Sequence, residues 1–151
     1  MSFHLSESMP VEKYREMLAA KSPFFQGKKS RRKSPEEDLH RTCFEWVVLM
    51  QRSQPVLKWM IHVPNGGKRP MGEAGKLKAM GVKPGVPDLL IPKASGSWMG
   101  LAIELKSPVG RLSDPQREWL AELAGEGYLC SVCRSFGEFE SVTNRYLGLV
   151  A

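Results

Sequence analysis

The sequence lacks any apolar run long enough to cross a bilayer, for which a helix needs about 20 consecutive apolar residues. Its first residues, MSFHLSESMP, also lack the basic and then apolar order of a signal peptide. These absences argue against membrane proteins and secreted proteins. We therefore expect a soluble, cytoplasmic protein with no membrane partner.

Cysteine is scarce, with only three in 151 residues, too few for a disulfide framework. Cys130 and Cys133 have the CxxC spacing of some zinc sites, but they fall in an apolar run that predicts a strand. Residues three apart in a strand face opposite ways, and only Cys43 and three histidines remain as further ligands. We therefore expect reduced, partly buried thiols, with structural zinc as the less favoured alternative.

Acidic residues are the minority among the charged ones, and the resulting net charge of +6 is unevenly distributed. Residues 1–34 carry eight Lys and Arg against three Glu, a net charge of +5, which leaves +1 for the rest of the chain. The densest basic cluster, GKKSRRK at residues 27–33, is typical of arms that bind nucleic acid. A solvated flexible linker is the alternative interpretation.

The overall composition, with 42% apolar and 25% charged residues, is that of one globular domain preceded by an accessory segment. Residues 9–20 have apolar residues at helical spacing, with Ser8 as a candidate N-cap and Pro10 near the first turn. We therefore expect residues 1–33 to form a helix and a basic arm, and residues 34–151 to form the main domain.

Ser34 begins the first helix of the main domain. Ser34 as N-cap, Pro35 at the first helical position and Glu37 after it make a capping box, and an apolar stripe follows. Glu36 heads that stripe, joined by His40 one turn on, whereas Glu37 is used by the cap. A carboxylate on a buried face is costly unless it is paired or binds a cation. Glu36 is thus a candidate site residue, and the alternative is that it only interacts with the positive end of the helix.

Residues 85–106 carry the most distinctive chemistry of the chain. They read GVPDLL, a short loop, and a second apolar run in which Glu104 and Lys106 alternate with aliphatic residues. With the period of two that a strand imposes, Glu104 and Lys106 project from one face. If the two runs pair as a hairpin across residues 93–99, Asp88 comes close to that face. Two carboxylates and a lysine then converge, which is the composition of a hard-metal site that works on phosphate.

Phosphodiester hydrolysis needs a polarised phosphorus, a deprotonated water and a stabilised leaving oxygen, and Mg²⁺ or Mn²⁺ held by carboxylates can serve all three needs. Asp88 and Glu104 are the natural ligands, with the backbone carbonyl of Leu105 beside them. Lys106 would hold the water or offset charge on the phosphate. Glu36 would bind through water or support a second metal. An ExK triplet alone is frequent on exposed, salt-bridged strands, but a PD pair sixteen residues upstream makes this one more specific.

A glycine-rich basic segment precedes this hairpin. Residues 57–63 predict a strand, residues 74–80 predict a short helix, and residues 64–83 carry five Lys and Arg against one Glu. Because the segment leads into the turn before Asp88, we expect it to hold phosphates beside the scissile one, although exposed lysines near glycine turns are common. The expected nucleic-acid contacts are Asn65, Gly66, Gly67, Lys68, Arg69, Lys76, Lys83 and Arg111.

Ser113 begins another helix with a second capping-box pattern, in which Gln116 is the partner of the cap. Gln116 is therefore either a capping residue or a residue that holds the attacking water or a phosphate. A strand at residues 128–133 and a helix starting near Ser135 complete the order helix, strand, helical loop, strand, strand, helix, strand, helix. This order predicts an α/β or α+β domain around a mixed sheet.

The PD pair at Asp88 and the triplet from Glu104 to Lys106 resemble the PD-(D/E)xK nuclease superfamily. The chain more closely resembles the VRR-NUC nucleases in their stand-alone, phage-type form. This resemblance lies in three stretches, followed by a Gly-Tyr pair: PNGGKR, LKAMGVKPGVPDLLIP and GLAIELKSPVGRLSDPQREWL. The resemblance covers roughly residues 34–132, so residues 1–33 receive no support from it.

The resemblance implies a restriction-endonuclease-like core with a mixed central β-sheet flanked by helices. It implies a DNA endonuclease that depends on Mg²⁺ or Mn²⁺ and acts as a homodimer on branched DNA, such as Holliday junctions, in replication, recombination or repair. A bacterial or phage-infected cell is the implied setting. A non-catalytic DNA-binding module, or an enzyme that acts on RNA or on a small phosphoester, is the alternative.

By position, the resemblance also implies the residues of the site. The implied catalytic residues are Glu36, Asp88, Glu104, Lys106 and Gln116. His40 stands where relatives often have Gln, so its role stays open.

Overall fold

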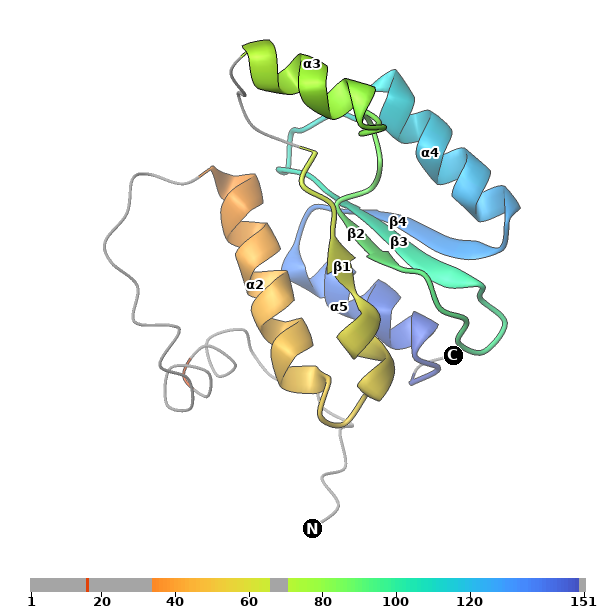
Figure 1. Ribbon diagram of the computed structural model, residues 1–151. Coiled ribbons are helices and arrows are strands. Elements are labelled where there is room, and N and C mark those ends of the chain that lie inside the picture. The colour runs from red at the N-terminus through yellow and green to blue at the C-terminus, as the bar shows by residue number, and fades with distance from the viewer. Residues whose placement is uncertain (1–15, 17–33, 66–70, 150–151) are drawn as a thin grey trace.

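The computed structural model describes residue 16, residues 34–65 and residues 71–149 (Figure 1). Apart from residue 16, the predicted helix at residues 9–20 and the basic arm at residues 27–33 lie outside this part of the chain. Four of the expected nucleic-acid contacts also lie outside it: Gly66, Gly67, Lys68 and Arg69. The division of the chain after residue 33 stays a prediction.

The strands of the described residues form one mixed sheet. It contains β1 (Ile61–His62), β2 (Leu89–Ile91), β3 (Gly100–Leu105) and β4 (Tyr128–Cys133), in that spatial order. β2 pairs antiparallel with both β1 and β3, whereas β3 and β4 pair parallel. Leu89 lies opposite Ile103, which confirms the predicted hairpin across residues 93–99.

Helices cover both faces of the sheet (Figure 1). On one face lie α2 (Pro35–Met50), α5 (Phe136–Tyr146) and the 3-10 helix η2 (Pro55–Trp59), and on the other lies α4 (Asp114–Gly125). α3 (Met71–Ala79) lies at the end of the sheet where α4 begins. A mixed sheet flanked by helices confirms the predicted α/β fold class.

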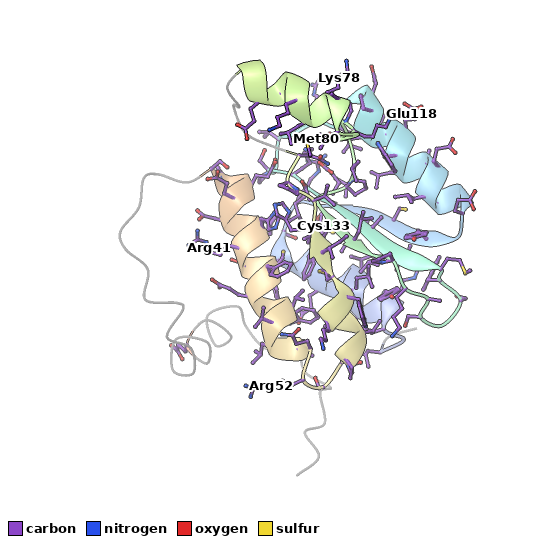
Figure 2. All side chains as sticks on the ribbon, viewed as in Figure 1. Arg41, Arg52, Lys78, Met80, Glu118 and Cys133 are labelled. Atoms are coloured by element: carbon purple, nitrogen blue, oxygen red, sulfur yellow. The ribbon has the colours of Figure 1, made fainter. Side chains whose placement is uncertain are left out.

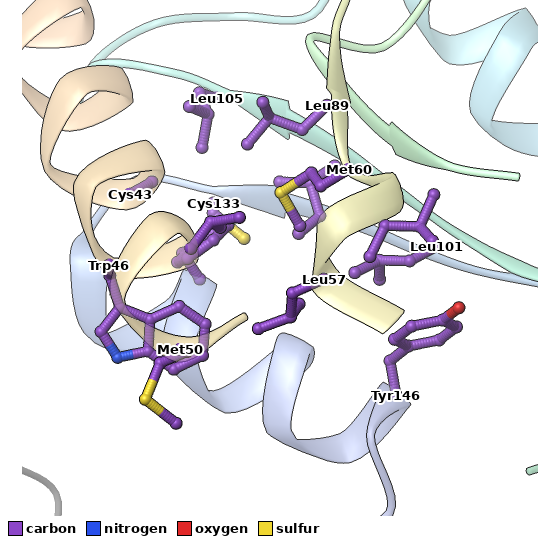
Figure 3. Close-up of a cluster of buried hydrophobic side chains, with 14 of the residues drawn as sticks. Cys43, Trp46, Met50, Leu57, Met60, Leu89, Leu101, Leu105, Cys133 and Tyr146 are labelled. Carbon is purple, nitrogen blue, oxygen red and sulfur yellow. The ribbon is translucent and has the colours of Figure 1, made fainter. Parts of the chain in front are cut away.

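The hydrophobic core lies between the sheet and the helices α2 and α5 (Figure 3). Trp46 of α2 and Phe139 of α5 are buried, and their rings meet edge to face with centroids 5.7 Å apart. Every residue of β3 is buried, so this strand is covered on both faces. Leu105 belongs to the core, whereas Glu104 before it projects the other way, towards α4.

The cysteines behave as small apolar residues. All three are free thiols, with Cys43 and Cys133 buried in the core and Cys130 half-buried. Burial raises the pKa of the Cys43 thiol, and it raises the pKa of Cys133 to about 11. Both thiols are therefore protonated at neutral pH and unreactive, in agreement with the expectation of reduced, partly buried thiols.

The predicted strand at residues 57–63 is wrong for most of its length. Pro55–Trp59 form η2, and only Ile61–His62 pair as a strand. The buried residues here are Leu57 and Met60, three apart. That spacing matches the three-residue turn of a 3-10 helix and not the alternation of a strand.

The helix starts agree better with the sequence. α2, α4 and α5 each follow a serine N-cap whose side chain accepts a hydrogen bond from the backbone amide three residues on. α3 begins at Met71, three residues before the predicted start, and ends at Ala79. Among the described helices, none combines the length and apolar character needed to span a bilayer.

Candidate active site

Asp88 lies immediately before β2, where its neighbours fix its position. Its Oδ2 accepts a hydrogen bond from the backbone amide of Leu105, 2.9 Å away at the end of β3. The Val63 amide donates to the Asp88 carbonyl at 2.9 Å, and Nδ1 of His62 lies 3.1 Å from the same oxygen. The hairpin therefore places the Asp88 carboxylate beside the end of β3, as predicted. The contact is to the amide of Leu105, and the expected metal contact through its carbonyl stays a prediction.

Glu104 and Lys106 form a buried ion pair on one side of the β3 segment. Nζ of Lys106 lies 2.7 Å from Oε1 of Glu104, and the two side chains are 11% and 1% exposed. An exposed, salt-bridged strand is therefore the wrong interpretation of this triplet. Burying a carboxylate costs several kcal/mol unless its oxygens are satisfied. The partners of each oxygen of Glu104 consequently decide what the site can do.

Gln116 supplies a second partner to the same oxygen. Its Nε2 donates to Oε1 of Glu104 at 2.5 Å, while its own Oε1 accepts from the Ser113 amide at 2.9 Å. The Ser113 hydroxyl accepts a hydrogen bond from the backbone amide of Gln116, and this bond closes the capping box. The two predicted roles of Gln116 were alternatives, but one side chain performs the capping role and also orients a site carboxylate.

The second oxygen of Glu104 has no such partner. Oε2 is buried and makes no hydrogen bond, whereas Oε1 accepts from both Lys106 and Gln116. A buried polar atom left unpaired costs about 1–3 kcal/mol, so natural proteins keep few of them. Oε2 is therefore open to a further partner, and a cation, a proton or a water molecule can each fill that place.

Burial raises the pKa of Glu104 to about 7, and the nearby carboxylates of Asp88 and Glu36 raise it as well, against the lowering effect of Lys106. Burial alone would lower the pKa of Lys106, but its bond to Glu104 and the charges of Glu104, Glu36 and Asp88 raise it overall. Lys106 is therefore a cation at neutral pH. It stands beside a carboxyl group whose pKa stays raised in spite of this ion pair.

A cavity of about 570 Å³ opens at Asp88, and neither Glu104 nor Lys106 is among its lining residues. Its walls come from the start of α2, from β1 and from the turn before β2, and the lining residues are Ser34, Glu36, Glu37, His40, Arg41, His62, Pro64 and Asp88. Glu36 is half-buried here, as predicted, whereas Glu37 is exposed and closes the cap with Ser34 at 3.2 Å. The cavity, called below the acidic cavity, therefore brings Glu36 and Asp88 together from distant parts of the sequence.

Two histidines form one wall of the acidic cavity. The rings of His40 and His62 meet edge to face with centroids 4.2 Å apart. Burial lowers the pKa of His40, and the neighbouring His62 lowers it further. No local pattern of residues selects His62, because its position depends on the pairing of β1 with β2, which sets it opposite Leu89.

The site residues converge without forming a closed ligand set. In the part of the chain that the structure describes, no three His, Cys, Asp or Glu side chains are grouped closely enough to hold a metal ion as they stand. Oε1 of Glu104 and Oδ2 of Asp88 are both engaged by protein donors. Oε2 of Glu104 remains, and carboxylate oxygens are the donors that Mg²⁺ and Mn²⁺ prefer. The chemistry of these residues therefore fits a hard divalent cation.

The turn before Asp88 is attached to α4. Nε1 of Trp119 donates to the Pro84 carbonyl at 3.1 Å, and Gly85 lies against the first turn of the helix. Gly85 has φ +81°, and a Cβ there would lie 2.5 Å from the carbonyl carbon of Pro115 and 2.8 Å from the Gln116 amide. Asp88 and Gln116 are thus positioned by one packed junction.

The expected nucleic-acid contacts separate into two groups. Nδ2 of Asn65 donates to the Val86 carbonyl at 2.5 Å, so this side chain is used to hold the turn. Lys76, Lys83 and Arg111 are exposed, and Lys83 lines a second cavity together with Asn65. Their contact with nucleic acid stays a prediction.

Two comparisons with known proteins give matches. The family model described as VRR-NUC domain matches residues 34–137, which is more than half of the chain. A solved structure named VRR_NUC domain protein is similar to this chain with 31% identity and a TM-score of 0.63, over 79% of this chain and 93% of that one. No curated protein matches the chain. The matched residues include every element that carries a site residue.

Proposed function

Because the chain belongs to the VRR-NUC family and so carries a nuclease domain, we propose that it is a metal-dependent DNA endonuclease of the PD-(D/E)xK superfamily. The observation that carries the proposal is the unpaired Oε2 of buried Glu104, next to Lys106 and beside the Asp88 carboxylate. A pure DNA-binding module would gain little from buried carboxylates near phosphates, which they repel.

The proposed metal ligands are Asp88, Glu104 and the backbone carbonyl of Leu105, with Glu36 acting through water. A bound Mg²⁺ or Mn²⁺ would supply Lewis-acid activation of the phosphate and a more acidic water. Gln116 keeps Oε1 of Glu104 in place, and hydrogen bonds of this kind orient a ligand before the metal arrives. The protein thus holds the Glu104 carboxylate in place, while the proposed ligands as they stand do not yet form a closed set among the described residues.

Lys106 has a separate task in the proposed reaction. Its ammonium group is cationic at neutral pH and points at the same carboxylate that would hold the metal. From there it can donate a hydrogen bond to the attacking water or to a phosphate oxygen whose negative charge grows in the transition state. Such stabilisation acts only if the ammonium is present, so loss of Lys106 should affect turnover more than DNA binding.

Branched DNA, in particular a Holliday junction, is the proposed substrate, and a homodimer is the proposed active form. The support is the resemblance of the motifs around Asn65, Asp88 and Glu104 to stand-alone, phage-type VRR-NUC nucleases. Roles in replication, recombination or repair, in the cytoplasm of a bacterial or phage-infected cell, follow from the same resemblance. Cleavage of a four-way junction, a flap and a linear duplex, together with a mass measurement in solution, tests this part. Paired symmetric nicks by a dimer are expected.

The decisive test of the activity compares Lys106→Ala with Lys58→Ala. Lys58 is exposed on η2, so its removal changes the charge equally without touching the site. With Mg²⁺ or Mn²⁺ we expect cleavage by wild type and by Lys58→Ala, and a loss of about 100-fold or more for Lys106→Ala. EDTA should stop all cleavage. Cleavage that survives EDTA or the Lys106→Ala change contradicts the proposal, and DNA binding without metal uptake in calorimetry would favour a binding module. RNA competitors in the same assay separate the RNA alternative.

A further inference from the structure

α3 carries almost no buried surface of its own. All its described side chains are exposed except that of Leu77, which is half-buried. A Cβ added at Gly72 or Gly75 would meet nothing within 4 Å. A helix of nine residues is marginal in isolation and normally depends on tertiary packing. α3 therefore has an open face that the rest of the described chain does not cover.

Leu77 lines a cavity of about 570 Å³, called below the Trp119 cavity. Its apolar walls come from three separate segments and include Pro64, Leu77, Val82, Val86 and Trp119, with Lys83 also in the lining. The volume suits a small planar group, since ligand sites of this kind measure about 300–1,000 Å³. Lys78 and Met80 of the α3 segment and Glu118 of α4 are all on this end of the molecule (Figure 2).

The Trp119 cavity adjoins the acidic cavity. Pro64 lines both of them, on the stretch that runs from β1 towards α3. The turn before Asp88 also joins them, because Val86 lines the Trp119 cavity and Asp88 lines the acidic cavity. A strand with one phosphate at Asp88 would therefore have a nearby nucleotide within reach of the Trp119 cavity.

The charge near the Trp119 cavity and the chemistry of its walls indicate what kind of group the cavity would bind. Residues 71–83 carry Lys76, Lys78 and Lys83 against Glu73, a net charge of +2, so an anionic partner is favoured. The indole of Trp119 is fixed by its bond to Pro84, which offers a preoriented aromatic surface. Apolar and aromatic walls suit a base, and Lys83 in the lining can pair with its phosphate, while Glu73 on the other part of the lining leaves the apolar surface as the main attraction.

We propose that the Trp119 cavity binds one unpaired nucleobase of the DNA strand whose backbone lies at the acidic cavity. The inference rests on the proposed function and adds how the site would choose its substrate. A base inside a duplex is stacked and paired, and its extrusion costs a few kcal/mol, whereas an unpaired base costs little. The cavity would thus favour branched, flapped or frayed DNA without reading sequence.

The test compares Leu77→Glu with Met80→Glu in the full-length protein, with EDTA present so that DNA is bound and not cut. Met80 is 71% exposed and does not line the cavity, so it gives the same charge change on neighbouring backbone. Val82→Glu is a second cavity variant, and Val82 is already 41% exposed, so the change is tolerable for folding. The probe is an oligonucleotide with 2-aminopurine in an unpaired flap, and a duplex with 2-aminopurine is the reference.

Leu77→Glu and Val82→Glu should weaken binding of the flap by about 10-fold relative to Met80→Glu, because a stacked base contributes about 1–3 kcal/mol. Duplex binding should be equal in all three variants, and only wild type and Met80→Glu should change the emission of the flap probe. Equal flap binding by all variants, or unchanged emission with wild type, overturns the inference while junction cleavage still supports the nuclease. Failure of wild type to bind the flap in EDTA also overturns the inference, whereas the nuclease proposal is tested separately by cleavage with Mg²⁺ or Mn²⁺.

Discussion

The first turns of α2 and α4 are built from the same motif but have different functions. Each has a serine N-cap, a proline in the first turn and a capping box, with Glu37 as the partner in α2 and Gln116 in α4. Glu37 is exposed at the rim of the acidic cavity and closes its cap. Gln116 closes its cap and also donates to Glu104.

The difference comes from the chemistry of an amide. A carboxylate only accepts hydrogen bonds, so Glu37 uses its acceptor on the cap and has no donor for a second carboxylate. The amide of Gln116 accepts at one end and donates at the other, so it links the backbone of α4 to the site. A capping box in a sequence therefore locates a helix start, and the residue type at its third position decides whether the cap can also position a ligand.

The largest effect should come from Glu104, the residue that Gln116 supports. Glu104→Gln removes the negative charge that a metal needs and should lower cleavage of a four-way junction by about 100- to 1,000-fold. Glu37→Gln makes the same chemical change at the capping partner of α2 and should leave the rate near that of wild type. Rates measured with Mn²⁺ at equal protein concentration check this, and equal losses in both variants would remove the distinction between the two helix starts.

Gln116→Ala should have the next largest effect. It removes the donor to Oε1 of Glu104 and should lower metal affinity or cleavage by about 10- to 100-fold, the usual cost of losing a group that orients a metal ligand. Gln116→Glu keeps the cap but faces Glu104 with another acceptor, so it should not restore activity. Mn²⁺ titration beside the cleavage assay separates the metal effect from the rate effect. Full activity in Gln116→Glu would show that only the cap matters.

Gly85→Ala tests the packing of the turn before Asp88 against the first turn of α4, a contact that has no counterpart at the start of α2 among the described residues. Because the new Cβ would strike the backbone at Pro115 and Gln116 in a left-handed conformation, we expect a loss of about 2 kcal/mol in the free energy of unfolding. Gly81→Ala is the matched control, since Gly81 has φ +94° but open space around it, and it should cost about 1 kcal/mol. Urea denaturation measures both. An equal loss in the two variants would mean that the contact with α4 is unimportant.

The smallest effects should come from the caps themselves. Ser34→Ala and Ser113→Ala each remove one side-chain acceptor and should lower the free energy of unfolding by about 1 kcal/mol. Only Ser113→Ala should also reduce cleavage, because it loosens the turn that holds Gln116. Thermal unfolding and the junction assay on the same samples give both values. A larger loss of cleavage in Ser34→Ala than in Ser113→Ala would mean that the cap of α2, and not the cap of α4, supports the site.

Features set by neighbouring residues were predictable from the sequence. The caps at Ser34 and Ser113 follow from residue types a few positions apart, and the β2–β3 hairpin follows from two apolar runs around a short loop. The common face of Glu104 and Lys106 follows from the period of a strand. These signals need no knowledge of the tertiary structure.

Features set by distant contacts were not predictable. The burial of Glu104 depends on how α4 covers β3, and the role of His62 depends on the register of β1. The mistaken strand near Leu57 arose because a 3-10 helix that buries two residues three apart also produces a short apolar run. The Trp119 cavity combines residues between 63 and 86 with Trp119 of α4, which is distant from them in the chain.

Binding of Mn²⁺ in the absence of DNA tests the central claim most directly, because the claim rests on the unpaired Oε2 of Glu104. Calorimetric titration of wild type and of Glu104→Gln, with DNA left out, gives the two affinities. The account predicts saturable binding by wild type and an affinity lower by about 10-fold or more in Glu104→Gln. Equal Mn²⁺ binding by the two proteins, or none by wild type, would contradict it.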